Sequence, residues 1–171
     1  LLATVAEGKT KRIFIEGSDS QEKIALENNK PQMYDINLPS NALGFSAQLY
    51  GNKTYGDLFT DRQLIALTTF SNIITSIQET IEKDASQKGF ETTSGCLNDG
   101  VKNSKSYAEA LIVYLSLGIG RMSDISNSLC NWSNSADQAV HLFGRQAIPM
   151  VWDFAETNVF SRKAGDFTTS L

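Results

Sequence analysis

The chain has 171 residues, of which 41% are hydrophobic and 20% are charged, and its formal net charge is −4. Such values are typical of one ordinary globular domain. The negative net charge excludes a protein that binds duplex DNA through many phosphate contacts, so any contact with DNA would have to be local.

Membrane and metal partners are also limited by the sequence. The longest uncharged run, 63–78, is too short and too rich in Thr, Ser and Asn to cross a bilayer, so we expect no membrane partner and a cytoplasmic location. Cys96, Cys130 and the single His141 are too few for a structural zinc site, which needs four ligands. We expect two free thiols in a reduced cytoplasm, with a disulfide between them as the alternative.

The first fifty residues predict short elements joined by turns. Residues 11–15 read as a short strand that is closed by turn-forming residues, and 20–28 read as a weak helix. The segment 29–41 is rich in Pro and Asn and predicts an irregular connection. Apolar and polar residues then alternate over 45–50, which predicts a second strand before a turn at Gly51.

Two long amphipathic helices follow. Thr60 and Gln63 form a capping-box pattern, and the apolar residues after them recur at three- and four-residue steps, so we predict a helix over 60–84. A second capping pattern at Ser106 opens a helix predicted over 106–129.

Two glycines interrupt the second helix, Gly118 and Gly120. Each costs roughly 1 kcal/mol against alanine inside a helix. We therefore expect a close approach there, most simply by the first long helix. Between the two helices, residues 85–105 carry few apolar anchors and predict a mobile loop that separates subregions 1–84 and 106–171 of a single domain.

A third, short helix is predicted near 135–144, where Ser135 and Gln138 repeat the capping pattern. Pro149 prevents that helix from continuing into the segment behind it. The predicted fold class is therefore α+β and predominantly helical, with two long amphipathic helices, a short third helix and a few short strands.

The segments 128–132 and 143–156 hold both tryptophans, a proline and an Arg-Gln pair close to two acids. This density of recognition-type side chains predicts a binding surface. The candidate substrate- or partner-binding residues are Arg145, Gln146, Trp132, Trp152, Asp153 and Glu156.

Each candidate has a structural alternative. The two indoles either bury apolar area in the core or offer a face on which an extruded base can stack. Arg145 either forms a salt bridge with Asp153 or Glu156 or contacts a phosphate or substrate. No nucleophile or metal ligand lies near the two acids in sequence, so no catalytic residue is predicted.

The amino-acid sequence of two blocks, 42–70 and 128–156, resembles that of a family of adenine-specific DNA methylases. These are large bacterial and archaeal proteins that begin with a domain of unknown function and carry a zinc-ribbon insert. The resemblance implies S-adenosylmethionine as the cofactor of the full-length enzyme, and DNA and the remainder of the methylase as partners. A glycine-rich cofactor loop after a strand and an Asp-Pro-Pro-Tyr-like tetrapeptide are both missing here. We therefore expect an internal, non-catalytic segment that contributes to DNA or target recognition.

The alternative is a helical protein–protein interaction module with no enzymatic role. Its apolar helix faces and its Arg-Gln-aromatic loop would dock onto another protein or onto a second copy. The acidic charge favours this alternative for the isolated chain.

Overall fold

The computed structural model describes residues 3–27, 31, 36–144, 146–161, 166–169 and 171. Its fold class is α+β, as predicted. The helices of the described part are α1 (Asp19–Leu26), α2 (Asp61–Ser76), α3 (Gln78–Gln87) and α4 (Ser104–Ile125). Its strands are β1 (Ala3–Glu7), β2 (Arg12–Glu16), β3 (Trp132–Ser133) and β4 (Gln138–Ala139).

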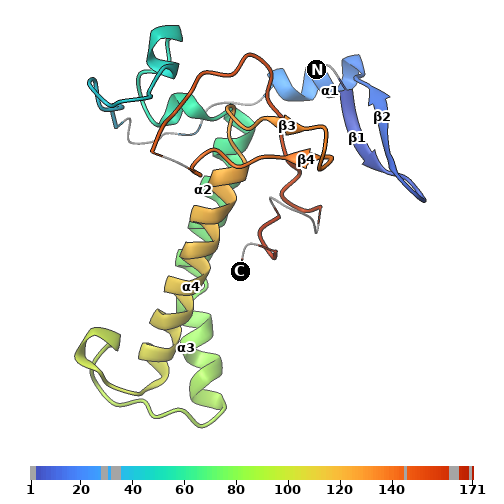
Figure 1. Cartoon of the computed structure of the whole chain (residues 1–171). Helices are drawn as coiled ribbons and strands as arrows, with labels where there is room; N and C mark the ends of the chain where they lie inside the picture. Colours follow the sequence, from blue (N-terminus) through green and yellow to red (C-terminus); the bar gives the residue numbers. More distant parts are fainter. Residues whose placement is uncertain (1–2, 28–30, 32–35, 145, 162–165, 170) are drawn as a thin grey trace.

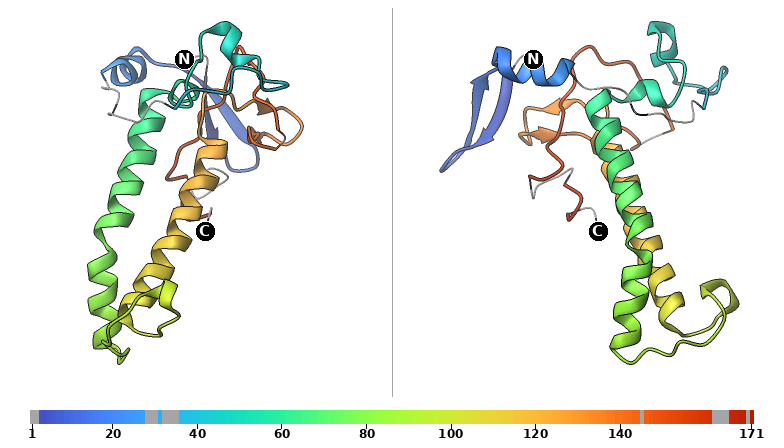
Figure 2. Two further views of the ribbon diagram at one scale, coloured as in Figure 1. Left: turned by 90° about the vertical axis from the view of Figure 1, so that its left-hand side faces the viewer. Right: turned by 180° about the vertical axis from the view of Figure 1, so that it is seen from behind.

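The helices α2, α3 and α4 form a long antiparallel hairpin that projects from a smaller body of loops and short strands (Figures 1 and 2). In all three views α4 runs beside the α2–α3 rod, and residues of α4 contact both α2 and α3. Among the described residues, none of the helices is both long enough and apolar enough to cross a bilayer.

The first long helix begins where its sequence predicts. The Thr60 hydroxyl accepts a hydrogen bond from the Gln63 backbone N–H, and the Gln63 side chain accepts one from the Thr60 N–H, at 3.3 and 2.8 Å. At Ile77 the rod divides into α2 and α3. It ends before Gly89, whose φ of 94° stops the helical backbone.

The second long helix begins two residues earlier than predicted. Asn103 is its N-cap, because the Asn103 side chain accepts a hydrogen bond from the Ser106 N–H at 2.8 Å. The capping box expected between Ser106 and Glu109, three residues later, does not form. The Glu109 carboxylate instead accepts a hydrogen bond from the Leu97 N–H at 2.6 Å and ties the α3–α4 connection to α4.

The expected packing of the first long helix against Gly118 and Gly120 is wrong. A Cβ atom added at Gly118 would lie 2.7 Å from Leu171, near the chain end, and 3.3 Å from Phe167. A Cβ added at Gly120 would meet nothing within 4 Å. The first glycine therefore makes room for the C-terminal segment, whereas the second faces open space.

We therefore expect Gly120→Ala to raise the free energy of unfolding by about 1 kcal/mol, because alanine is the better helix former at an unobstructed position. Urea unfolding followed by circular dichroism measures the change. Gly118→Ala is the matched control, and it should gain less because Leu171 must move. A destabilised Gly120→Ala protein would contradict the open environment.

The strand predicted over 45–50 is wrong. Residues Ala47–Tyr50 form a 3-10 helix that ends at Gly51, whose φ is 106°. Ala47 is fully buried while Leu49 is 84% exposed, so the two residues do not share a face as they would in a strand. The alternation of apolar and polar residues over 45–50 does not reflect a strand, because the i+3 spacing of the 3-10 turn decides which of these residues are buried.

The prediction of a short helix near 135–144 is also wrong. Residues 132–139 form the hairpin β3–β4, in which Trp132 pairs with Ala139 and Ser133 with Gln138. Ser135, the predicted helix start, lies instead in the turn between the two strands, where its hydroxyl is 3.2 Å from the Ser133 hydroxyl. The Ser133 hydroxyl also accepts a hydrogen bond from the Ala136 N–H at 3.3 Å. Asp137 completes the turn with a φ of 49°, a conformation that Asp tolerates.

The hydrophobic core lies at the base of the helical hairpin, where residues 38–58 meet residues 129–148. Its buried members are Leu38, Ala47, Leu58, Leu129, Leu142 and Ile148. The two segments are also bonded through their backbones, since the Ser46 N–H donates to the Ile148 carbonyl at 3.0 Å and the Ser128 N–H donates to the Leu58 carbonyl at 2.8 Å. Gly44, with a φ of 80°, lets the chain approach Ala147 closely.

The predicted N-terminal strand and weak helix are confirmed as β2 and α1. Strand β1 was not predicted, and it pairs with β2 in an antiparallel hairpin of five residue pairs. Helix α1 begins with a capping box between Ser18 and Gln21. Within 3–27 no residue is buried.

Candidate functional site

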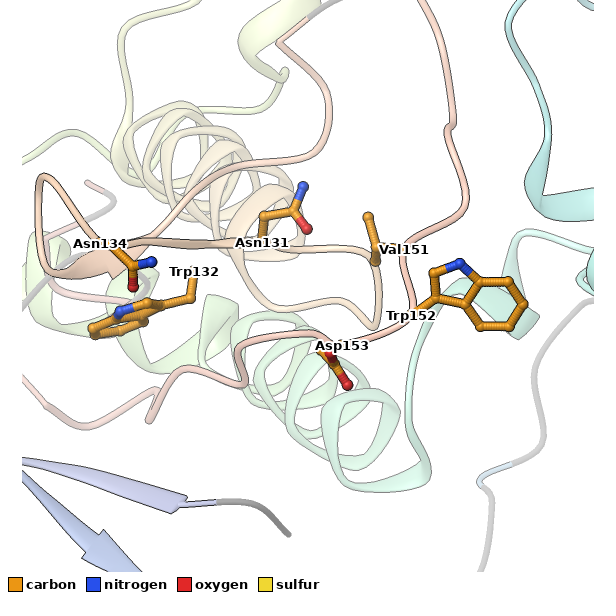
Figure 3. A pocket seen from close by; sticks show the side chains of 6 residues that line it. All are labelled: Asn131, Trp132, Asn134, Val151, Trp152 and Asp153. Carbon is orange, nitrogen blue, oxygen red and sulfur yellow. The ribbon is translucent and has the colours of Figure 1, made fainter.

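Both tryptophans line one open hollow of about 470 Å³ on the body of the molecule, which we call the tryptophan hollow. Its lining residues are Asn131, Trp132, Asn134, Val151, Trp152 and Asp153. Figure 3 shows the two indole rings at opposite ends of the hollow, with Asp153 between them. The structure thus brings together three of the predicted site residues, Trp132, Trp152 and Asp153.

Hydrogen bonds tie the two walls of the tryptophan hollow to each other and to neighbouring segments. The Ala155 N–H donates to the Cys130 carbonyl at 2.8 Å, and the Val140 N–H donates to the Asn131 carbonyl at 2.8 Å. The Met150 N–H donates to the Ser46 hydroxyl at 2.9 Å. Both walls are therefore anchored to the core beneath them.

Trp132 is half-buried between two residues of the N-terminal hairpin. The Phe14 ring meets it edge to face, with centroids 6.2 Å apart, and the Arg12 guanidinium lies 5.6 Å from the indole centroid. Such a cation–π contact stabilises by about 0.5–1 kcal/mol at an exposed site. Phe14 and Arg12 lie more than a hundred residues from Trp132 in sequence, and no local pattern signals this contact.

Trp152 is not a core residue. Its side chain is 79% exposed, and the ring contact that it makes is with Tyr50, edge to face at 5.2 Å. A large exposed aromatic ring beside a second one offers an apolar face to a ligand. The structural alternative, that both indoles are partial core, therefore holds for Trp132 and is wrong for Trp152.

Glu156 has an ion-pair partner that the sequence did not indicate. Glu156 forms a two-pronged ion pair with Arg62, in which Arg62 Nη2 and Nε lie 2.6 and 3.1 Å from the two carboxylate oxygens. Hydrogen bonding to Glu156 raises the pKa of Arg62 above its usual value. This pair pins the segment behind the hollow to the start of α2, and half-exposed pairs of this kind stabilise by about 1 kcal/mol or less.

Two predicted site residues remain, Arg145 and Gln146. Arg145 lies outside the described residues, so its role stays a prediction. Gln146 is exposed and is not among the side chains that line the hollow. The single histidine, His141, lies 3.2 Å from the Asp124 carboxylate, which also accepts a hydrogen bond from the Phe143 N–H. This contact joins the end of α4 to the loop after β4.

Both cysteines are free thiols, and they differ in environment. Cys130 is fully buried beneath the hollow and donates to the Ile125 carbonyl at 3.1 Å. Burial raises the pKa of the Cys130 thiol to about 11. Cys96 is partly exposed, and its thiol donates to the Asp99 carboxylate at 3.0 Å.

We expect a thiol reagent at mildly alkaline pH to modify Cys96 and leave Cys130 intact in the folded protein, because Cys96 is partly exposed whereas burial shields Cys130 and raises the pKa of its thiol. Since the raised pKa belongs to the folded state, the unfolded chain loses this proton first, and stability falls as pH rises above the usual thiol pKa towards 11. Mass spectrometry after timed alkylation measures both sites. Equal labelling of the two cysteines would contradict a buried Cys130.

The side chains that line the tryptophan hollow are suited to hydrogen bonding with a ligand more than to chemical catalysis. The Asn131 and Asn134 amides can both donate and accept hydrogen bonds, and Asp153 can accept them. Within the described ranges, no three His, Cys, Asp or Glu side chains gather in a way that could hold a metal ion. Sequence reasoning missed the two asparagines, although both lie within two residues of Trp132 in the chain.

Comparisons with protein-family models, curated proteins and solved structures gave no match to this chain.

Proposed function

We propose that this chain is a non-catalytic docking segment of an S-adenosylmethionine-dependent DNA adenine methyltransferase, which would place it in the cytoplasm. It packs against the remainder of the methylase polypeptide and presents the tryptophan hollow towards the DNA target. Two kinds of support meet here. The large exposed surface of the chain favours docking onto another polypeptide. The amino-acid sequence of 42–70 and 128–156 resembles that of the methylase family.

The observation that carries the docking function is the size of the exposed surface. A compact protein of 18.8 kDa has an accessible surface of about 8,300 Å². This chain exposes 11,839 Å². The excess of roughly 3,500 Å² is several times what one partner contributes to a standard protein–protein interface, about 800 Å².

Large apolar side chains contribute to that surface. On α4, Val113, Tyr114 and Leu117 are 54%, 70% and 66% exposed and follow one another at helical spacing. We call these three residues the apolar stripe of α4. An exposed stripe on a helix that already packs against α2 and α3 on another side is typical of a helix that is buried on both sides in its complete assembly.

The DNA-facing part of the proposal rests on the tryptophan hollow. Exposed aromatic rings stack on bases at about 1–3 kcal/mol per base, and this contact tolerates any sequence. The chain has a net charge of −4, so phosphate contacts would have to come mainly from the remainder of the enzyme.

Reassembly from two pieces tests the proposal. The chain alone should give no saturable calorimetric isotherm with S-adenosylmethionine and no methyl transfer to adenine in DNA. Mixed with a separately expressed remainder of a methylase of this family, it should restore transfer of a labelled methyl group. Leu117→Arg should weaken the reassembly, whereas Ser116→Arg, an exposed neighbour outside the stripe, should not.

A helical interaction module with no enzymatic role is the second candidate, and the negative charge together with the apolar stripe of α4 favours it. It predicts that the chain fails to restore methyl transfer with every such remainder. Saturable binding of S-adenosylmethionine by the chain alone would contradict both candidates.

A further inference from the structure

Strand β2 has an open edge. In the part of the chain that the structure describes, β2 pairs with β1 alone, and Figure 1 draws β2 on the side of the hairpin away from the helices. A two-stranded sheet is marginally stable by itself. Natural edge strands are commonly protected by a proline, a bulge or a charge at their centre. The sequence of β2, Arg-Ile-Phe-Ile-Glu, has none of these.

The ladder pattern shows which backbone groups are free at this edge. The Gly8 N–H donates to the Lys11 carbonyl at 3.0 Å, which makes Gly8 and Lys11 a hydrogen-bonded pair. Because such pairs alternate along an antiparallel ladder, the N–H and C=O groups of Arg12, Phe14 and Glu16 point away from β1.

The side chains of β2 are self-complementary about Phe14. If a second β2 is laid antiparallel against the open edge with the two Phe14 residues opposite each other, Arg12 of each copy faces Glu16 of the other. The outward backbone groups of Arg12, Phe14 and Glu16 then meet one another in the same register. Opposite charges placed directly across a strand pair are favourable, whereas like charges are not.

We propose that β2 pairs antiparallel with β2 of a second copy of this chain and forms a continuous four-stranded sheet with a two-fold axis at Phe14. The interface is isologous, with the same strand contributed by both copies. The exposed side chains of Ile13 and Ile15, at 44% and 48%, gain a cross-strand neighbour in this sheet. The inference does not depend on the proposed methylase function, because it rests on the strand edge and the charges of β2, although Arg12 and Phe14 also contact Trp132.

Sedimentation of the whole chain over a range of concentrations tests the assembly. A five-residue strand pair is smaller than a standard interface, so we expect a reversible dimer with a Kd of about micromolar. Glu16→Arg places two arginines opposite each other at both ends of the strand pair and should raise the Kd by roughly tenfold or more. Glu22→Arg on α1 makes the same charge change elsewhere and should leave the Kd unchanged.

A charge exchange and a cross-link keep the test independent of folding. An Arg12→Glu protein should associate with a Glu16→Arg protein more tightly than either associates with itself, because opposite charges again meet across the strands. In a Cys96→Ser background, Phe14→Cys should form a disulfide between copies, since hydrogen-bonded antiparallel pairs place their Cα atoms about 5.5 Å apart.

Ile24→Cys is the control for the cross-link, because Ile24 and Phe14 are 64% and 61% exposed. It should cross-link much more slowly. A chain that stays monomeric throughout the concentration range overturns the proposal and leaves the edge for a strand of another polypeptide. A dimer that is indifferent to Glu16→Arg, or that cross-links no faster at position 14 than at position 24, overturns it as well.

Discussion

Replacing Leu58 with alanine is expected to lower the free energy of unfolding by about 2–5 kcal/mol. The Leu58 side chain is fully buried in the core, where residues 38–58 meet residues 129–148. Truncation removes apolar contacts and leaves a cavity that the backbone cannot close, because the Leu58 carbonyl is held by the Ser128 N–H and hydroxyl at 2.8 and 2.9 Å. Since small domains have a total stability of only about 5–15 kcal/mol, this loss is a large part of the whole.

Urea denaturation followed by far-ultraviolet circular dichroism measures this loss. Leu117→Ala is the matched control, because Leu117 is 66% exposed on α4 and its truncation should change stability by about 0.5 kcal/mol or less. Tryptophan fluorescence should report the same transition, since the hollow rests on this core. A Leu58→Ala protein as stable as the control would mean that the two segments are held together elsewhere.

Local sequence signals predicted the long helices because their cause is local. The reciprocal hydrogen bonds of Thr60 and Gln63 need only a helix start and an apolar stripe behind it, and both are present. A similar capping pattern at Ser135 and Gln138 led to a wrong prediction. There the chain pairs Trp132 with Ala139 and buries Ala139 and Leu142, so tertiary packing decides the conformation.

The features of the candidate site also divide into those that local sequence predicts and those that only the folded chain brings together. Trp132 and Trp152 could be placed together from the sequence because their segments are close in the chain. Their outer partners could not, since Phe14 and Tyr50 come from distant segments that only the folded chain brings near. The pairing of Glu156 with Arg62 was missed because the two residues are 94 positions apart, and charge patterns in a sequence do not show which distant residues the fold brings together.

Replacing Trp152 with alanine is expected to leave folding intact and weaken DNA binding of the reassembled methylase. The indole is 79% exposed, so its removal should change the free energy of unfolding by about 0.5 kcal/mol or less. If the ring stacks on a base, its loss should cost about 1–3 kcal/mol of binding, or roughly five- to 150-fold in Kd. Fluorescence anisotropy with a labelled single-stranded oligonucleotide measures the Kd, and Leu26→Ala on α1, where Leu26 is 77% exposed, is the control for loss of an exposed apolar side chain.

The two readouts separate the roles of Trp152. Weakened binding with unchanged stability assigns the indole to DNA, because its one ring contact within the described residues, with Tyr50 at 5.2 Å, would then matter little for folding. Trp152→Phe should recover part of the affinity, since a smaller aromatic face still stacks. If Trp152→Ala left the Kd for DNA unchanged, the tryptophan hollow would not be a DNA-binding site. In that case the exposed rings would be a surface for the protein partner, because aromatic residues are enriched where protein interfaces are buried.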